Sequence, residues 1–271
     1  MRYIRAEAVE TAASAVAEGA LPLAGGTILV PMIARCERQE QTFVDIGRLA
    51  ELSRIETTNS SLLVGSMVPL DAIARTADAP ALRALIQAAK AVGNPQVRRA
   101  GTIGGNVAAA VPTTDVYPAL IALDAQITSL RGSLSENLPI DQFIPQGRLI
   151  VSIEVPNDSE AVSAFRKFAW RASAGITMAN VAACLHIRAG KILASRIVVG
   201  GVSAHAQRLG QTEKLVTGRP ASEWNQRLLQ EAGATAAQEA VCDLPSPPSP
   251  EYRRRLIDAG VREVLSEILQ I

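Results

Sequence analysis

The chain has 271 residues, of which 48% are hydrophobic and 20% are charged. This composition is typical of a folded globular protein and excludes a disordered one. The 27 basic and 26 acidic residues nearly cancel, which leaves a formal charge of +1. Such a balance gives no long-range attraction for polyanions, so a nucleic-acid partner is not expected.

Signals for metals, disulfides and membranes are weak. The cysteines, Cys36, Cys184 and Cys242, lie far apart and form no CxxC pair. We therefore expect no metal, no iron–sulfur cluster and no disulfide framework on this chain. No apolar run approaches the roughly 20 residues that span a bilayer, and acidic residues follow the N-terminus too early for an export signal. A cytoplasmic protein without a membrane span is expected.

The first half of the sequence alternates apolar helical and strand patterns with polar breaks. A glycine turn follows the first short strand, and residues 93–106, rich in Gly, Pro, Asn and Arg, are expected to lack regular structure. Helices are expected over residues 6–18, 28–35, 70–77, 79–92 and 116–123. Strands are expected over residues 42–46, 62–66, 125–130 and 149–155, and residues 21–27 are expected to form a short strand that enters a glycine turn.

In the second half, residues 164–170 alternate like a strand. Two β-branched runs, 180–188 and 192–199, flank Ala189-Gly190-Lys191 and predict a hairpin. Helices are expected over residues 221–232 and 251–268, with the proline-rich segment 243–250 extended between them. The turn-forming stretch after Val155 predicts a domain boundary. Because no strict βαβ rhythm appears, the pattern indicates an α+β fold.

Two glycine-rich segments carry the strongest chemical signal, Ala24-Gly25-Gly26-Thr27 and Gly101-Thr102-Ile103-Gly104-Gly105-Asn106. Paired glycines permit left-handed backbone angles and remove Cβ atoms that would block a ligand. Consecutive amides can then face one hollow that holds anionic oxygen. Two such hollows that converge would hold a pyrophosphate. Either turn alone is more often a simple tight turn, and neither matches GxGxxG or the P-loop pattern.

Together these segments resemble the FAD-binding subunit of the molybdenum hydroxylases, the family of the flavin parts of xanthine dehydrogenase and carbon monoxide dehydrogenase. The resemblance runs along nearly the whole chain. Besides the glycine turns, it includes Gly93 to Arg99, Pro112 to Asp115, Leu123-Asp124-Ala125, Ile150 to Ile153, Lys167 to Arg171, Asp243 and Tyr252-Arg253-Arg254.

The resemblance implies an α+β architecture with a two-subdomain FAD-binding fold of the p-cresol methylhydroxylase/vanillyl-alcohol oxidase type. A small C-terminal α+β domain with a three-stranded antiparallel sheet follows. We expect an FAD-binding domain over residues 1–157, with subdomains of about 1–55 and 56–157, and a C-terminal flavoprotein domain over residues 158–271.

The resemblance also implies which residues bind FAD. The pyrophosphate and ribityl chain are expected on the two turns, Val92 and Gly93 near the flavin ring or its sugar chain, and Asp115 on cofactor hydroxyls. Ile150 and Lys167 match positions that contact the cofactor from the adenine or C-terminal side. The expected set is Leu23, Ala24, Gly25, Gly26, Thr27, Ile28, Val92, Gly93, Thr102, Gly104, Gly105, Asn106, Asp115, Ile150 and Lys167.

Simpler roles stay open for several of these residues. Asp115 is also placed to cap the helix expected after it. Val92 and Ile150 suit an ordinary core, and Lys167 a solvated surface. Two departures from the family pattern stand out, since the family often has Asp where this chain has Ile28 and commonly has Asp at the position of Gly175. The second departure puts NAD specificity in doubt and leaves Ile176 as a candidate to shield the ring.

The resemblance implies an electron-transfer subunit without catalytic side chains of its own. It would take electrons from 2Fe–2S clusters on a small subunit, which receives them from a large molybdopterin subunit, and pass them to NAD, a quinone or another acceptor. The expected assembly is a heterotrimer or a dimer of heterotrimers. Two alternatives remain open, a stand-alone FAD oxidoreductase of the same wider fold and a cofactor-free scaffold.

Overall fold

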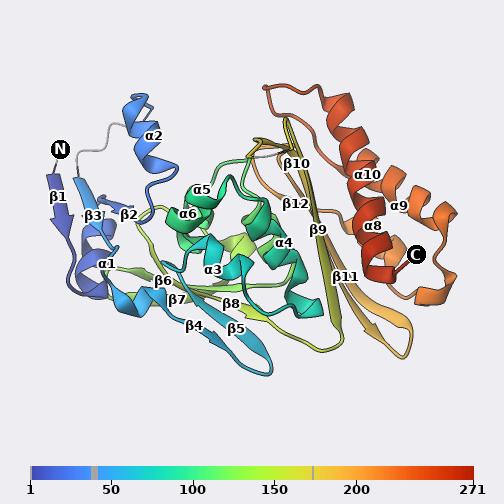
Figure 1. The fold of residues 1–271 in the computed structure, drawn as a ribbon, viewed down its shortest axis with the longest axis horizontal. Helices are drawn as coiled ribbons and strands as arrows, with labels where there is room; N and C mark the ends of the chain where they lie inside the picture. The colour runs from blue at the N-terminus through green and yellow to red at the C-terminus, as the bar shows by residue number, and fades with distance from the viewer. Residues whose placement is uncertain (1, 38–41, 173) are drawn as a thin grey trace.

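The structure is a computed structural model that describes residues 2–37, 42–172 and 174–271. Three sheets follow one another along the long axis of the molecule, and helices pack between and beside them (Figure 1). The N-terminus lies at one end of this arrangement and the C-terminal helices lie at the other. This confirms the α+β class that the sequence predicted.

The N-terminal layer is a small parallel sheet in the order β1-β3-β2, packed against one amphipathic helix. That helix buries Val9, Ala12, Ala13 and Val16, the spacing of one helical face. Gly19, with φ of 99°, follows the end of the helix. The elements are β1 (Arg2–Arg5), α1 (Val9–Ala17), β2 (Leu21–Leu23), α2 (Leu29–Ala34) and β3 (Thr42–Asp45).

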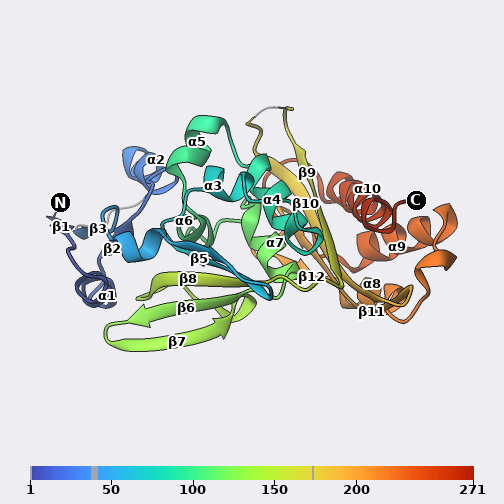
Figure 2. The same ribbon diagram turned by 60° about the horizontal axis from the view of Figure 1, so that its bottom comes forward.

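The middle layer is a five-stranded antiparallel sheet in the order β4-β5-β8-β6-β7, with helices on one face (Figure 2). Its strands are β4 (Ile55–Thr57), β5 (Ser61–Gly65), β6 (Gln126–Arg131), β7 (Leu134–Pro139) and β8 (Leu149–Pro156). The helices are α3 (Leu70–Ala74), α4 (Arg83–Ala91), α5 (Pro95–Ala100), α6 (Ile103–Ala108) and α7 (Val116–Ala122). Three short 3-10 turns accompany them, η1 (Ala50–Ser53), η2 (Pro80–Leu82) and η3 (Ile140–Gln142).

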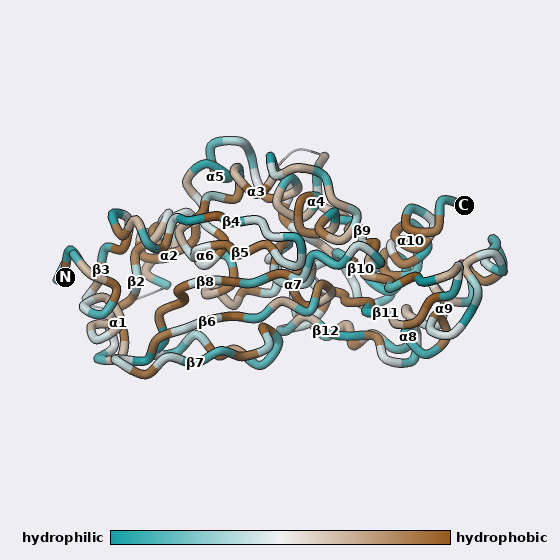
Figure 3. The backbone as a smooth tube through the Cα atoms, turned by 90° about the horizontal axis from the view of Figure 1, so that it is seen from below, coloured by the Kyte–Doolittle hydropathy of each residue, from teal (hydrophilic) through white to brown (hydrophobic). Residues whose placement is uncertain are grey.

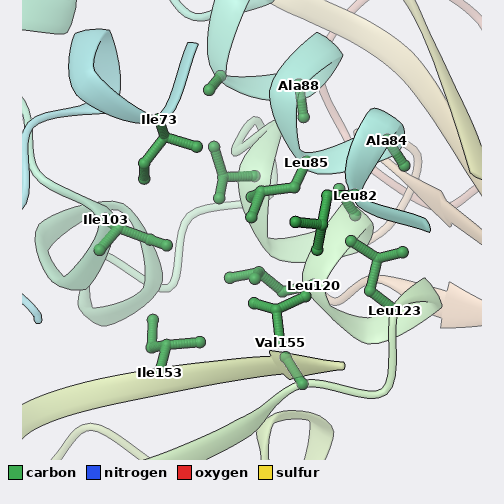
Figure 4. Packing of buried hydrophobic residues seen from close by; sticks show 14 of the residues in the cluster. Ile73, Leu82, Ala84, Leu85, Ala88, Ile103, Leu120, Leu123, Ile153 and Val155 are labelled. Carbon is green, nitrogen blue, oxygen red and sulfur yellow. The ribbon is translucent and has the colours of Figure 1, made fainter. Parts of the chain in front are cut away.

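The largest core fills the space between these helices and the sheet. Leu85 of α4 and Leu120 of α7 pack above Ile153 and Val155 of β8 (Figure 4). All four side chains are fully buried. The core therefore holds the glycine-rich helix α6, which contributes Ile103, against the sheet.

The C-terminal layer is an antiparallel sheet in the order β12-β11-β10-β9. Its three long strands are the expected three-stranded sheet, and a two-residue strand extends it. Helices α4 and α7 cover one face and α10 the other (Figure 2). The elements are β9 (Ala161–Ala169), β10 (Thr177–Arg188), β11 (Lys191–Gly200), β12 (Gln207–Arg208), α8 (Gly210–Val216), η4 (Ala221–Glu223), α9 (Gln226–Glu239) and α10 (Pro250–Leu269).

Strand β10 explains the continuous apolar run in the second half of the sequence. Ala182 and Cys184 belong to the core shared with the first half of the chain, whereas Val181 and Ala183 belong to the core beneath the C-terminal helices. A strand covered on both faces has no solvent side, so polar alternation disappears. The hydrophobic stretches of β10 and β11 are visible as brown segments in Figure 3.

The expectation that residues 93–106 lack regular structure is wrong, because two short helices form there. The Asn94 side chain accepts a hydrogen bond from the Val97 amide at 2.8 Å, and Pro95 occupies the first helical position of α5. Thr102 caps α6 in the same way, by accepting from the Gly105 amide at 3.0 Å. Capping therefore outweighs the low helix propensity of Gly and Asn.

Other element boundaries also shifted. Helix α9 starts after the Asn225 cap, whereas the predicted start near Ala221 is a 3-10 turn. The sequence did not predict α8 or the short or polar strands β1, β4, β7 and β12. The predicted hairpin turn is present, with positive φ at Ala189 and Gly190.

The expected domain boundary at residues 157 and 158 falls between β8 and β9 and stays a prediction. Among the described helices, none is long and apolar enough to cross a membrane.

Candidate functional site

The two glycine turns, which are 75 to 80 residues apart in the sequence, meet in the structure. A Cβ atom built on Gly101 would lie 3.2 Å from the hydroxyl oxygen of Thr27. One built on Gly105 would lie 4.0 Å from the Cβ atom of Ala24. The loop after β2 therefore lies against the start of α6, where a Cβ at position 101 would be tight against Thr27 and one at position 105 would reach ordinary contact with Ala24.

A cavity of about 200 Å³ lies where the two turns meet, and we call it the glycine-turn cavity. It holds nine of the fifteen residues predicted to bind FAD. These nine are Ala24, Gly25, Gly26, Thr27, Ile28, Val92, Thr102, Gly105 and Asn106. Because a small-molecule site usually measures several hundred Å³, a dinucleotide would extend beyond this cavity along adjoining surfaces.

The two turns differ in the backbone donors that they offer. The amides of Gly25, Gly26, Thr27 and Ile28 have no hydrogen-bond acceptor among the described residues. In the second turn, by contrast, most amides are used within the protein. Gly104 donates to Ser66, and Gly105 and Asn106 both donate to Thr102, whereas the Thr102 amide itself has no acceptor among the described residues. Most of the free amides for an anion are therefore supplied by the first turn, while the second supplies space and the amide of Thr102.

Asn106 gives the second turn a polar group that faces the cavity. Its residue is 7% exposed, and its side-chain oxygen has no hydrogen-bond partner among the described residues. A buried acceptor without a donor is unfavourable, so a ligand that brings a hydroxyl would stabilise it. Gly105 leaves the space beside this acceptor free of a side chain, and the acceptor fits the hydroxyl-bearing sugar chain of a dinucleotide.

Val92 and Gly93 form a backbone strap at the edge of the glycine-turn cavity. Val92 lines the cavity, whereas Gly93, with φ of 47°, does not and instead packs on Val97. The Arg98 guanidinium donates to the carbonyl oxygens of Val92 and Gly93, at 3.0 and 3.2 Å. Arg98 therefore fixes the strap. Arg99 is exposed and lies 3.9 Å from the Asp71 carboxylate.

Asp115 lies outside the glycine-turn cavity, in a buried polar cluster with residues of β9 and β10. Its carboxylate accepts from the Lys167 ammonium at 2.6 Å, the Thr177 hydroxyl at 2.8 Å and the Asn180 amide at 3.1 Å. Burial raises the pKa of the Asp115 carboxyl, and Lys167, Thr177 and Asn180 oppose that rise. Asp115 precedes α7 but its side chain makes no capping bond, so the helix-cap alternative is wrong.

The remaining predicted residues have other surroundings. Leu23 ends β2, and Ile150 is a core residue of β8 that is 4% exposed. A Cβ on Gly104 would lie 2.6 Å from the Cβ of Ser66, so this glycine serves packing between α6 and β5. Lys167 lines a second cavity of about 500 Å³, next to Ala91. Whether any of these residues contacts FAD stays a prediction.

Sequence reasoning missed several residues that line the glycine-turn cavity. Leu29 and Met32 follow the first turn on α2, and Ala108 and Ala109 follow Gly105 on α6. A helical spacing of four residues from Gly25 and Ile28, and of three and four from Gly105, would have found them. Leu21, Pro22, Leu70, Val97 and Gly101 complete the lining, and only the tertiary structure brings them there.

The two departures from the family pattern lie in different places. Ile28 lines the glycine-turn cavity, where it adds apolar surface. Gly175 lies in the loop between β9 and β10, and a Cβ there would be 2.5 Å from the Arg171 carbonyl oxygen. The described conformation of that loop thus excludes a side chain at position 175. Ile176 is 65% exposed.

Comparisons with known proteins agree with this geometry. Residues 1–158 match the family model described as the FAD binding domain in molybdopterin dehydrogenase. Residues 163–268 match that of the CO dehydrogenase flavoprotein C-terminal domain. The chain therefore belongs to the family of FAD-binding subunits of molybdenum hydroxylases, and its own cofactor is FAD.

Individual relatives fit the same family. The glyceraldehyde dehydrogenase medium chain of Sulfolobus acidocaldarius is 27% identical, over 98% of this chain and 97% of its own length. The carbon monoxide dehydrogenase medium chain of Hydrogenophaga pseudoflava is 35% identical over 49% of this chain and 50% of its own length. We conclude that the chain is an oxidoreductase subunit. Among its described residues, no cluster of His, Cys, Asp and Glu could hold a metal ion.

Solved structures share the fold. A carbon monoxide dehydrogenase structure from Hydrogenophaga pseudoflava superposes with a TM-score of 0.89, at 24% identity, over 100% of this chain and 97% of the other. Quinoline 2-oxidoreductase from Pseudomonas putida 86 gives a TM-score of 0.87, at 21% identity, with the same coverage. The chain thus shares the fold of chains in these two solved structures.

Proposed function

We propose that this chain is the electron-transfer subunit of a molybdenum, iron–sulfur and flavin dehydrogenase complex, and that FAD lies across the glycine-turn cavity. The observation that carries the proposal is the meeting of two distant glycine turns around one hollow, with free amides on one side. Consecutive free amides are suited to bind the oxygens of a diphosphate without Lys or Arg.

The protein's part is to bind and orient the cofactor. Amides of the first turn would hold the pyrophosphate, and the Asn106 side-chain oxygen would accept from a sugar-chain hydroxyl. Val92, held by Arg98, would place apolar surface beside the ring. When bound, FAD supplies the capacity to accept and release electrons. The donors and acceptors of those electrons lie on partners.

We infer that the partners are a small subunit with 2Fe–2S clusters and a large molybdopterin subunit. The names of two relatives support this, since nicotine 6-hydroxylase of Paenarthrobacter nicotinovorans and the carbon monoxide dehydrogenase of Hydrogenophaga pseudoflava both have a medium subunit or chain. NAD or a quinone would be the external acceptor. The expected assembly is a heterotrimer or a dimer of heterotrimers.

Flavin content tests the proposal directly. The purified chain, titrated with FAD, should bind one FAD per chain with quenching of flavin fluorescence. Expression together with its partner subunits should yield a complex that contains iron, molybdenum and FAD. A chain that binds FAD but assembles with no such subunits would be a stand-alone oxidoreductase, whereas a folded chain that binds no FAD would be a scaffold.

Gly105→Val locates the site. A branched side chain at position 105 would extend between Thr102 and Ala24 into the glycine-turn cavity, so FAD binding should be lost while most of the fold remains. Ala234→Val, at an exposed position of α9, is the matched control for a β-branched residue in a helix. Undiminished flavin in Gly105→Val would place the cofactor elsewhere.

A further inference from the structure

The buried cluster around Asp115 joins the two halves of the chain. Asp115 lies at the start of α7 in the first half, and its three donors, Lys167, Thr177 and Asn180, come from β9 and β10 in the second. Asn180 also donates to the carbonyl oxygen of Thr114, at 3.0 Å. Asp115 is 3% exposed, and protein donors contact both oxygens of its carboxylate. These contacts fix the position of the carboxylate.

The Lys167 ammonium, beside the second cavity, is held at a defined point by two contacts. It donates to the Asp115 carboxylate at 2.6 Å and to the Ala91 carbonyl oxygen at 3.0 Å. Ala91 lines the second cavity together with Lys167, while the next residue, Val92, lines the glycine-turn cavity. An ammonium has three N–H groups, and these two contacts leave one for a ligand.

We propose that Asp115 is a positioning residue for Lys167 and that it acts on the cofactor only through this ammonium. The inference rests on the proposed function, because it assumes FAD beside Val92. It departs from the role that the family resemblance implies for Asp115, which is direct bonding to cofactor hydroxyls. In this arrangement Lys167 presents its third N–H to a carbonyl oxygen or ring nitrogen of the isoalloxazine.

Burial and charge favour this division of roles. The Asp115 carboxylate lies outside the glycine-turn cavity and already accepts three hydrogen bonds. The Lys167 side chain is 12% exposed, and the second cavity reaches it. A lysine buried to this extent needs a counter-ion to stay charged, and Asp115 is the carboxylate that contacts it. Thr177 and Asn180 in turn hold that carboxylate in place.

A double-mutant cycle on FAD affinity separates the two roles. The FAD-free protein and its variants Asp115→Asn, Lys167→Met and Asp115→Asn/Lys167→Met are titrated with FAD. We expect each single change to weaken binding by about tenfold, the scale of one charge-assisted hydrogen bond. The double variant should bind within about twofold of Lys167→Met, because Asp115 has nothing left to position.

The absorption spectrum of bound FAD provides a readout that a purely structural role would not move. In Asp115→Asn, the Lys167 ammonium loses its 2.6 Å carboxylate partner and is no longer held at one point. The flavin absorption maxima of FAD bound to that variant should therefore shift in the same direction as those of Lys167→Met. The double variant should match Lys167→Met.

Two controls keep the result interpretable. Asp124→Asn removes another carboxylate that pairs across the two halves, with Arg196 at 2.7 Å, but on the surface; its FAD affinity should match wild type. Lys167→Gln is made beside Lys167→Met, and thermal unfolding of each FAD-free variant identifies those that fold.

The outcomes are distinct. If the effects of Asp115→Asn and Lys167→Met multiply in the double variant, Asp115 contacts the cofactor itself and the inference is overturned. A wild-type flavin spectrum in Asp115→Asn also overturns it. If wild type binds no FAD, the proposed function fails first, and the cycle then reports only on stability.

Discussion

The carbonyl oxygen of Ala100 occupies the position that a side chain on Gly25 would need. A Cβ atom built on Gly25 would lie 1.7 Å from that oxygen, well inside van der Waals contact. The last residue of α5 and the first glycine turn therefore touch backbone to backbone. This contact fixes one wall of the glycine-turn cavity, so the position tolerates only glycine.

Gly25→Ala should consequently damage both the fold around the cavity and the binding of FAD. Backbone must move to admit the methyl group, and overpacking of this kind costs about 1–3 kcal/mol of unfolding free energy. Chemical denaturation and FAD titration measure the two effects. Gly210→Ala is the control, because a Cβ there would meet its nearest atom, on Glu239, at 3.9 Å. Equal behaviour of the two variants would contradict the backbone contact.

Arg98→Met should weaken FAD binding more than it weakens the fold. Without the guanidinium, the carbonyl oxygens of Val92 and Gly93 lose their donor and the strap beside the cavity loosens. We expect a loss of affinity of about tenfold, equivalent to one hydrogen bond to a charged group. Arg99→Met, one residue further along α5, should leave the affinity unchanged because Arg99 is exposed. Similar losses of affinity in both variants would show that the positive charge of α5, and not the contact with the strap, determines FAD binding.

Two buried serines should respond oppositely to alanine. The Ser163 hydroxyl accepts from the Ala84 amide at 2.9 Å and donates to the Ala81 carbonyl oxygen at 2.8 Å, joining β9 to the start of α4. Ser163→Ala leaves these groups unpaired and should cost about 1–3 kcal/mol in urea unfolding. The Ser129 hydroxyl is equally buried but has no partner among the described residues. Ser129→Ala should be neutral or stabilising in the same unfolding experiment. A large loss of stability would show that the Ser129 hydroxyl does form a hydrogen bond.

The three cysteines should differ in reactivity. Burial raises the pKa of the Cys184 thiol to about 12 and also raises that of Cys242, whereas Cys36 is exposed. At about pH 8, iodoacetamide should therefore modify Cys36 in the native protein and reach the others only on unfolding. Mass spectrometry of alkylated peptides gives the answer. Rapid alkylation of Cys184 in the native protein would show that β10 separates from its neighbours often enough to expose this thiol.

The Cys184 thiol also predicts a stability trend. A folded pKa above the unfolded value means that the unfolded chain releases the proton first as the pH rises. Stability should be unaffected below about pH 8 and should decline above it, toward the folded pKa. Cys184→Ala should flatten this decline. An unchanged alkaline slope in the variant would assign the effect to other groups.

The sequence by itself determined the class of the fold, most of the long elements and the two turns. The apolar periodicity of α1, the hairpin of β10 and β11, and the glycine pairs are local signals, because each depends on neighbouring residues alone. Local reasoning failed at residues 93–106, where caps at Asn94 and Thr102 override weak helix formers. It also failed for edge strands such as β7, whose polar sequence lacks a buried face.

Only the tertiary structure decided which segment supplies the amides, which supplies the space, and which charged groups pair. Packing of Gly25 on Ala100 shows that the turns form one hollow, and hydrogen bonds within the protein use most amides of the second turn but none of those from Gly25 to Ile28. The partner of Asp115 was likewise invisible in the sequence, because Lys167 lies 52 positions away and reaches it only when α7 packs against the C-terminal sheet. Burial, which depends on every layer at once, decides which charged groups face a ligand and which face each other.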